Sequence, residues 1–313
     1  MPLILIAGAD DSGRRLDRVL RKALRQTPLS VIHRILRQGL VLVDGRKAEA
    51  GRHVRAGETI TVPITECEDT SNLRFAPGGE KTPLEMPEVL FEGSGLLILN
   101  KPVGLSVHGK GSCDSLVQSY LAPKLRPSLS FKPGPLHRLD KPSSGVLVFS
   151  ASLEGARLFS EMMREGKIKK RYLAIVEGQI ENEEVWKDEL FHDTRVKKTY
   201  AGNSGGNNSG QEKGKPALTR LKALVGNKKH SLVLLEIETG RTHQIRAQAA
   251  SRGHPLLGDK KYGGGPLSGG FLLHAWRLYL PPPFPPLVEA PLPENFKSKV
   301  KKLFGVSSEE ILK

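Results

Sequence analysis

The chain has 313 residues, 38% of them hydrophobic, and a net charge of +15 with a pI of about 9.8. This length suits one large domain with a small one, and the positive charge favours a polyanionic partner. The two cysteines, Cys67 and Cys113, are too few and too far apart for a disulfide scaffold or a zinc knuckle. The apolar run 3–7 lacks the preceding bases of a signal peptide, and no stretch approaches the roughly 18 apolar residues of a membrane span. We therefore expect a soluble, cytoplasmic protein.

The first part of the chain predicts two short helices followed by a hairpin. Apolar residues recur at helical spacing within residues 14–25 and again after Thr27-Pro28. Thr27 is expected to cap the second helix, with Pro28 in its first turn, and Gly39 is expected to end it. The elements expected next are a strand at 40–43, a turn at Asp44-Gly45 and a strand at 59–62.

This front segment is strongly basic. Between Arg14 and Arg55 it carries twelve Lys or Arg against three Asp or Glu, a net charge of +9. The polar helix faces include Arg18, Arg21 and Arg34. Over about residues 12–62 the pattern resembles the alpha-L RNA-binding motif, so we expect residues 1–66 to form an RNA-binding domain. The alternative is a solvated helical face without an RNA contact.

The composition changes after this segment. Residues 67–87 are rich in proline and glycine and are expected to form a linker to a second domain, 88–313. Its many strands and few crossover helices indicate an α+β fold with a mixed, mostly antiparallel sheet and flanking helices. Strands are expected at 89–91, 96–100, 145–150, 172–177, 218–225, 231–238 and 272–280. Helices are expected at 153–164, at 242–252 and in the tail near 296–304, and a surface loop at 202–214.

The run His137-Arg138-Leu139-Asp140-Lys141-Pro142-Ser143-Ser144-Gly145 carries the clearest chemical signal. It places the carboxylate of Asp140 between basic residues, in a turn-forming stretch that leads into an apolar strand. Flanking cations keep a carboxylate ionised, and such a group can act as a nucleophile. Taken alone, the same residues are also compatible with a surface ion pair of little energetic value.

Three further stretches carry chemically useful residues. In 100–109 a strand ends in a Lys-Pro turn, and in 169–178 three bases precede Tyr172, whose ring could stack on a nucleobase. In 238–263 a glycine turn precedes Thr242, which can cap a helix, and Arg246 could then pair with a nearby carboxylate. Each stretch alone also fits an ordinary structural role, as a strand-end turn, a core tyrosine or a surface helix residue.

Together the four stretches closely resemble the RluA family of pseudouridine synthases, through most of residues 88–280. The resemblance implies a reaction that breaks the uracil–ribose bond, turns the base and rejoins it through carbon 5. Redox balance does not change in such a reaction, so no cofactor and no metal is expected. The sequence agrees, because it contains no Gly-x-Gly-x-x-Gly after a strand and no P-loop.

The resemblance also implies roles for individual residues. Asp140 corresponds to the catalytic carboxylate, which would attack the ribose or the uracil, or take a ribose proton. Arg246 would form an ion pair with Asp140, and Tyr172 would lie against the target base and help to remove the proton from carbon 5. Arg138 would fill the gap left by the flipped uridine, and Ile245 would form the apolar wall of the pocket.

Other positions are given no catalytic role. Lys101, His108 and His137 are interpreted as structural or RNA-adjacent. The sequence differs from the usual family pattern at Gln248, where many relatives carry histidine, and at Pro142-Ser143. These departures bear on substrate preference more than on activity.

The leading hypothesis is a monomeric enzyme that acts on structured RNA. Large-subunit ribosomal RNA is the first choice and transfer RNA the second, and no membrane partner is expected. Two rivals are a non-catalytic protein that binds ribosomal RNA, and a hydrolase that releases uracil. The identity of the modified uridine, the atom that Asp140 attacks and the oligomeric state do not follow from the sequence.

Overall fold

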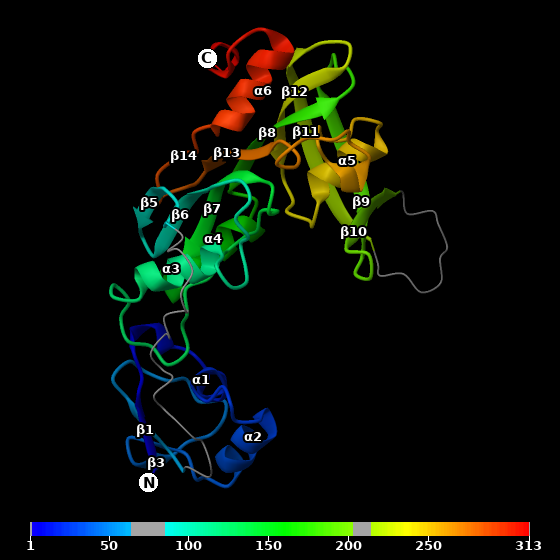
Figure 1. The fold of residues 1–313 in the computed structure, drawn as a ribbon. Coiled ribbons are helices and arrows are strands. Elements are labelled where there is room, and N and C mark those ends of the chain that lie inside the picture. Colours follow the sequence, from blue (N-terminus) through cyan, green and yellow to red (C-terminus); the bar gives the residue numbers. More distant parts are fainter. Residues whose placement is uncertain (1, 64–84, 203–213, 313) are drawn as a thin grey trace.

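The computed structural model describes residues 2–63, 85–202 and 214–312, in two sheets that belong to separate units (Figure 1). The expected linker 67–87 and the expected loop 202–214 therefore lie mostly outside the described residues. None of the described helices is long and apolar enough to cross a membrane.

The front unit packs two helices on a small antiparallel sheet of order β1-β4-β2-β3. The apolar faces predicted for the helices are buried, with Leu16, Val19 and Leu20 of α1 and Ile32 of α2 all inaccessible to solvent. The elements are β1 (Leu3–Ile6), α1 (Leu16–Ala23), α2 (Leu29–Arg37), β2 (Leu42–Val43), β3 (Arg46–Lys47) and β4 (Thr59–Val62).

Two details of this unit differ from the prediction. The run 3–7 was considered only as a signal peptide and rejected, but residues Leu3–Ile6 form β1, which pairs with β4 through registers such as Leu3 with Val62. Pro28 itself is the N-cap of α2, so Thr27 is not the cap and the proline stands one position earlier than expected.

The second unit is built on a ten-stranded mixed sheet. Its order is β10-β9-β11-β12-β8-β13-β7-β6-β5, with β14 paired to β13. All pairings are antiparallel except that of β13 with β7. This confirms the α+β class and the mixed, mostly antiparallel sheet.

Most of the expected elements are present, while α3, β9, β10, β14 and α7 were not predicted. The strands are β5 (Val89–Gly93), β6 (Leu96–Lys101), β7 (Ser144–Ser150), β8 (Lys169–Glu177), β9 (Glu184–Asp193), β10 (Lys198–Gly202), β11 (Lys215–Gly226), β12 (His230–Ile237), β13 (Leu273–Tyr279) and β14 (Leu287–Glu289). The helices are α3 (Cys113–Leu121), α4 (Leu153–Arg164), α5 (Gln244–Ser251), α6 (Glu294–Phe304) and α7 (Ser308–Ile311).

Helices cover both faces of the large sheet (Figure 1). Alternate residues of a strand point to opposite faces, so β8 contributes to two apolar cores. Tyr172 and Ala174 belong to the core that includes α3 and the start of α5, whereas Leu173 and Ile175 pack with α6. The strand that carries Tyr172 is therefore buried on both sides, which makes it a rigid support.

Candidate active site

The loop before β7 carries Asp140 and is held by backbone and side-chain hydrogen bonds. The N–H of Ser143 donates to the carbonyl of Asp140 over 3.0 Å, which closes a turn. Lys101, completely buried at the end of β6, fixes the loop from below. Its ammonium donates to the backbone carbonyls of Pro102, Leu105 and Lys141 over 2.8 to 3.3 Å. Lys101 is thus structural, one of the two roles considered for it.

Gly145, the second residue of β7, permits the close approach of β7 to β13. Its φ of +103° lies in the region that side chains rarely adopt, and a Cβ would lie 2.1 Å from the carbonyl oxygen of Ala275. The two strands run parallel here, with Gly145 opposite Ala275. The glycine, five residues after Asp140, therefore sets the position of the loop that precedes β7.

Arg246, in the first turn of α5, bridges two carboxylates. Its Nη1 lies 2.7 Å from Oδ2 of Asp140. Its Nε and Nη2 lie 2.6 and 2.9 Å from the two oxygens of Asp259, a bidentate pair. The guanidinium also lies over the rings of Phe271 and Tyr262, at 4.3 and 4.8 Å from the ring centroids. Burial alone would lower the pKa of Arg246, but hydrogen bonds and charge from Asp259 and Asp140 raise it, so the arginine stays charged.

His243 adds a second nitrogen beside the carboxylate. Its Nε2 lies 3.7 Å from Oδ1 of Asp140, and its Nδ1 lies 2.9 Å from the hydroxyl of Tyr262. The Tyr262 oxygen already accepts the N–H of Thr199, so its own proton is available to Nδ1. The neutral imidazole then directs Nε2–H toward Asp140. Burial outweighs the charge of Asp140 and lowers the pKa of His243 to about 4, so the ring is uncharged at neutral pH.

The start of α5 corrects one prediction. Thr242 was expected to cap the helix, but the N-cap is His243, in the left-handed conformation with φ of 53° and no capping hydrogen bond from its side chain. That conformation turns the chain sharply between β12 and α5. It allows His243 and Arg246 to face the same carboxylate.

Tyr172 lies on β8 beside these groups and is 7% exposed. Burial, reinforced by the charge of Asp140, raises its pKa well above the ordinary value for tyrosine. The phenol therefore remains protonated at neutral pH. A tyrosinate base is not available in the free protein, so removal of the carbon-5 proton by Tyr172 would first require another group to take the phenolic proton.

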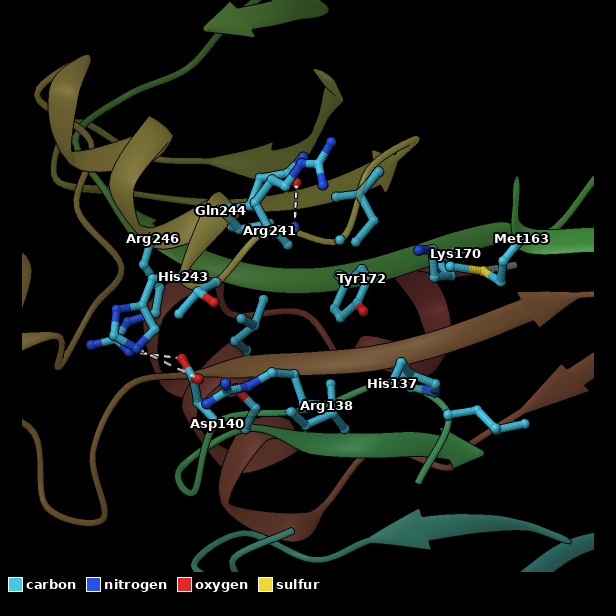
Figure 2. A pocket seen from close by; sticks show the side chains of 18 residues that line it. His137, Arg138, Asp140, Met163, Lys170, Tyr172, Arg241, His243, Gln244 and Arg246 are labelled. Carbon is cyan, nitrogen blue, oxygen red and sulfur yellow. Dashed lines mark hydrogen bonds and ion pairs between the residues drawn. The ribbon is translucent and has the colours of Figure 1, made fainter. Parts of the chain in front are cut away.

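A cavity of about 350 Å³ joins these residues (Figure 2). All five residues predicted for the catalytic part, Arg138, Asp140, Tyr172, Ile245 and Arg246, line it. Arg138 is exposed, whereas Ile245 is 5% exposed and supplies an apolar surface. The volume lies at the lower end of the range of about 300–1,000 Å³ for small-molecule sites and suits a nucleoside. Among the described residues, no cluster of three or more His, Cys, Asp or Glu side chains could hold a metal ion.

The remaining predicted residues lie elsewhere. Arg18, Arg21 and Arg34 are exposed on α1 and α2 of the front unit and do not line the cavity. His108 is mostly exposed, 3.8 Å from Asp114. Gln248 is fully buried away from the cavity, where it accepts from Thr219 and donates to Asp188. The presence of glutamine instead of the family's histidine at this position therefore does not alter the lining of the cavity.

Sequence reasoning missed Asp259, His243, Tyr262 and Phe271. The first three stand within the stretch 238–263 that was already singled out, among many other polar residues. Asp259 is 1% exposed, and a buried carboxylate requires a cationic partner. That requirement was the available signal, but the choice of Arg246 as the partner needed coordinates.

The structure combines a basic front unit with a cavity that holds a carboxylate and an arginine, and comparisons with known proteins show the family. Residues 95–251 match the family model described as RNA pseudouridylate synthase, and residues 14–60 match the S4 domain. The chain belongs to the RNA pseudouridylate synthase family and carries an S4 domain in front. The resemblance found in the motifs is thereby confirmed.

Curated relatives agree with this assignment. The chain is 32% identical over 267 residues to proteins named ribosomal large subunit pseudouridine synthase C from Salmonella typhimurium and Escherichia coli. The aligned region covers 83% of this chain and 79% of each relative. Among solved structures, human RNA pseudouridylate synthase domain containing 4 has a TM-score of 0.58 at 23% identity, covering 69% of this chain and 92% of that one. This likeness supports the fold.

Proposed function

We propose that this chain converts specific uridines of large-subunit ribosomal RNA to pseudouridine, with Asp140 as the catalytic carboxylate. The observation that carries the assignment of Asp140 is its 2.7 Å ion pair with the buried Arg246, at the wall of a nucleoside-sized cavity. The curated relatives, whose names specify the large ribosomal subunit, support the class of RNA. Transfer RNA is the second candidate.

The chemistry requires a group that reacts at the nucleoside and a site that retains the detached base. The bond from N1 to C1′ breaks, the base turns, a bond from C5 to C1′ forms, and the proton of C5 is transferred to N1. Asp140 would attack the ribose or the base, or take a ribose proton, while Arg246 holds its rotamer and stabilises its negative charge. The ring of Tyr172 and the apolar Ile245 would confine the uracil while it turns.

The uridine must leave its helical stack to reach Asp140, because a carboxylate cannot contact the glycosidic bond of a stacked base. Flipping costs a few kcal/mol, which phosphate contacts can offset. Arg138, exposed at the rim of the cavity, would occupy the gap in the RNA. Arg18, Arg21 and Arg34 of the S4 domain would bind the RNA backbone. We further propose that the protein is a monomer and acts in the cytoplasm. It should need no cofactor or metal, because the isomerisation transfers no group to or from the RNA and no electrons.

The experiment that tests this function maps pseudouridine across ribosomal and transfer RNA from cells with and without the gene. We expect one or a few large-subunit uridines to lose the modification without the gene and to regain it when the gene is returned. Loss confined to transfer RNA would reassign the substrate, and an unchanged map would contradict the proposal.

The two rival functions have separate measurements. A hydrolase would release free uracil from the purified RNA and leave an abasic site, whereas an isomerase keeps every base attached to its ribose. A non-catalytic RNA-binding protein would account for the positive charge. It would give no reason for the shared cavity of Asp140, Tyr172 and Arg246.

A further inference from the structure

Lys170 has a largely buried side chain whose ammonium finds no partner in the part of the chain that the structure describes. It precedes Tyr172 by two positions on β8, so both side chains lie on the same face of the strand, and both line the cavity (Figure 2). Lys170 is 6% exposed. Among the described residues, no side chain or carbonyl forms a hydrogen bond or ion pair with its ammonium.

Lys101 provides a comparison within the same domain. Both lysines are deeply buried, and burial lowers the pKa of each to about 8. The ammonium of Lys101 is satisfied by three backbone carbonyls. The ammonium of Lys170 has no such acceptors among the described residues and opens into the cavity instead.

The neighbours of Lys170 do not compensate its charge. His137 lies at the same end of the cavity (Figure 2), where burial and the charge of Lys170 lower its pKa to about 3. The neutral imidazole accepts the N–H of Val148 at Nε2. The loop after β12 approaches the ammonium at Gly240, where a Cβ would lie 3.6 Å from Nζ, but it offers no carboxylate there. Among the described residues, the ammonium therefore has no protein acceptor, and it is open to a ligand in the cavity.

We propose that Lys170 binds a backbone phosphate of the RNA beside the flipped uridine. This inference rests on the proposed function, because it assumes that an RNA nucleotide enters the cavity. Phosphate is the anion that every RNA nucleotide carries, and an anion compensates a desolvated ammonium better than a neutral carbonyl does. Asp140 lies at the reacting end of the cavity, and Lys170 lies on the opposite side of Tyr172 (Figure 2). The lysine would thus position the nucleotide through its backbone, independently of base identity.

The test measures the affinity for RNA as a function of salt. The probe is an unmodified transcript of large-subunit ribosomal RNA, and every protein carries Asp140→Asn to prevent turnover. We expect the additional change Lys170→Met to weaken binding about tenfold. It should also reduce the slope of log K against log[salt] by about 0.7, the value of one phosphate contact on a single strand.

A neutral methylphosphonate introduced one linkage at a time next to the target uridine locates the contact. At one linkage the methylphosphonate should weaken binding by the protein that carries Asp140→Asn alone. It should leave unchanged the binding of the protein that also carries Lys170→Met. An unchanged salt slope with weaker binding would show that Lys170 contacts a neutral group such as a uracil carbonyl, which overturns the proposal. Equal methylphosphonate sensitivity at every linkage would also overturn it.

Thermal unfolding separates this role from a structural one. Removing an unpaired buried charge should leave the melting temperature of Lys170→Met equal to or above that of the parent protein. The matched variant Lys101→Met, which loses three hydrogen bonds, should melt lower and keep the parent salt slope. A lower melting temperature for Lys170→Met would mean that the fold itself uses the lysine. These binding measurements need no turnover, so they test the role of Lys170 alone. The proposed isomerisation is tested separately, by formation of pseudouridine with the wild-type protein.

Discussion

At the scale of single residues, the site depends on how one guanidinium is shared. Arg246 contacts Asp140 with one nitrogen and Asp259 with two, so Asp259 holds the arginine in place and Asp140 receives the remaining donor. Asp259 is nearly inaccessible to solvent and does not line the cavity. Its contribution to catalysis should therefore be indirect, through the orientation of Arg246.

Replacement of Asp259 by asparagine tests this arrangement. We expect stability to fall by about 2–3 kcal/mol, because the buried guanidinium loses a charged partner. The rate of pseudouridine formation at saturating RNA should fall about tenfold or more, while RNA affinity changes little. Asp188→Asn is the control, since Asp188 pairs with Arg252 outside the cavity. An Asp259 variant that affects only stability, as Asp188→Asn should, would show that Asp259 does not position the arginine.

The lowered pKa of His243 predicts a dependence of stability on pH. Between the ordinary histidine pKa of about 6.5 and the folded value of about 4, the unfolded chain binds a proton that the folded chain does not. Stability should therefore fall as pH falls through this window, by about 1–3 kcal/mol for this residue. His137 and His274 contribute in the same direction.

The measurement is the free energy of unfolding from pH 4 to pH 8 for wild type and His243→Asn. Asparagine tolerates the left-handed backbone of this position better than most residues. The variant should show a shallower loss of stability toward acid. An identical pH profile would contradict a neutral, buried His243.

At the scale of elements, β7 positions the catalytic loop because a glycine brings it against β13. Gly145→Ala should destabilise the protein by about 3 kcal/mol or more, since it adds a steric clash to the strain of a positive φ. Gly104→Ala is the matched control: Gly104 has φ of +84° but open space around its Cβ position, so only the backbone strain of about 1 kcal/mol is expected. Urea unfolding measures both. Equal losses would show that the contact with Ala275 is unimportant.

The elements also explain how far the sequence could be interpreted. The apolar spacing predicted α4 at its observed bounds, and strong β-forming runs predicted β6, β7 and β8. α3 was missed because its sequence, Cys113–Leu121, has a weak apolar face, and β9 was missed because charged residues interrupt it. The ion pair of Asp140 with Arg246, 106 residues apart, came from the resemblance, since residue spacing carries no information about such a contact.

At the scale of the whole molecule, the S4 domain docks directly on the synthase domain. The carboxylate of Asp11, completely buried, accepts the N–H groups of Leu129 and Ser130 over 2.8 and 2.9 Å and the hydroxyl of Ser128. Asp10 accepts the N–H of Leu153, at the start of α4. The exposed bases of α1 and α2 therefore have a defined position relative to the cavity, so one RNA could contact both domains.

The role of these bases has its own test. Replacing Arg18, Arg21 and Arg34 together by alanine should weaken RNA binding and reduce the salt slope by about 2 to 3, because up to three phosphate contacts are lost. Affinity should fall far more than the rate at saturating RNA. Filter binding from low to high salt provides the measurement. A triple variant with the parent slope would indicate that these bases form only a solvated helical face.

The most direct test of the account combines Asp140→Asn with two readings on the same transcript of large-subunit ribosomal RNA. We expect pseudouridine, measured by mass spectrometry after nuclease digestion, to fall to the level without enzyme, while RNA affinity stays within about threefold of wild type. Asparagine preserves the shape of the side chain and removes the charge that Arg246 holds. Pseudouridine formed by the variant at the wild-type rate would contradict the central role of this carboxylate.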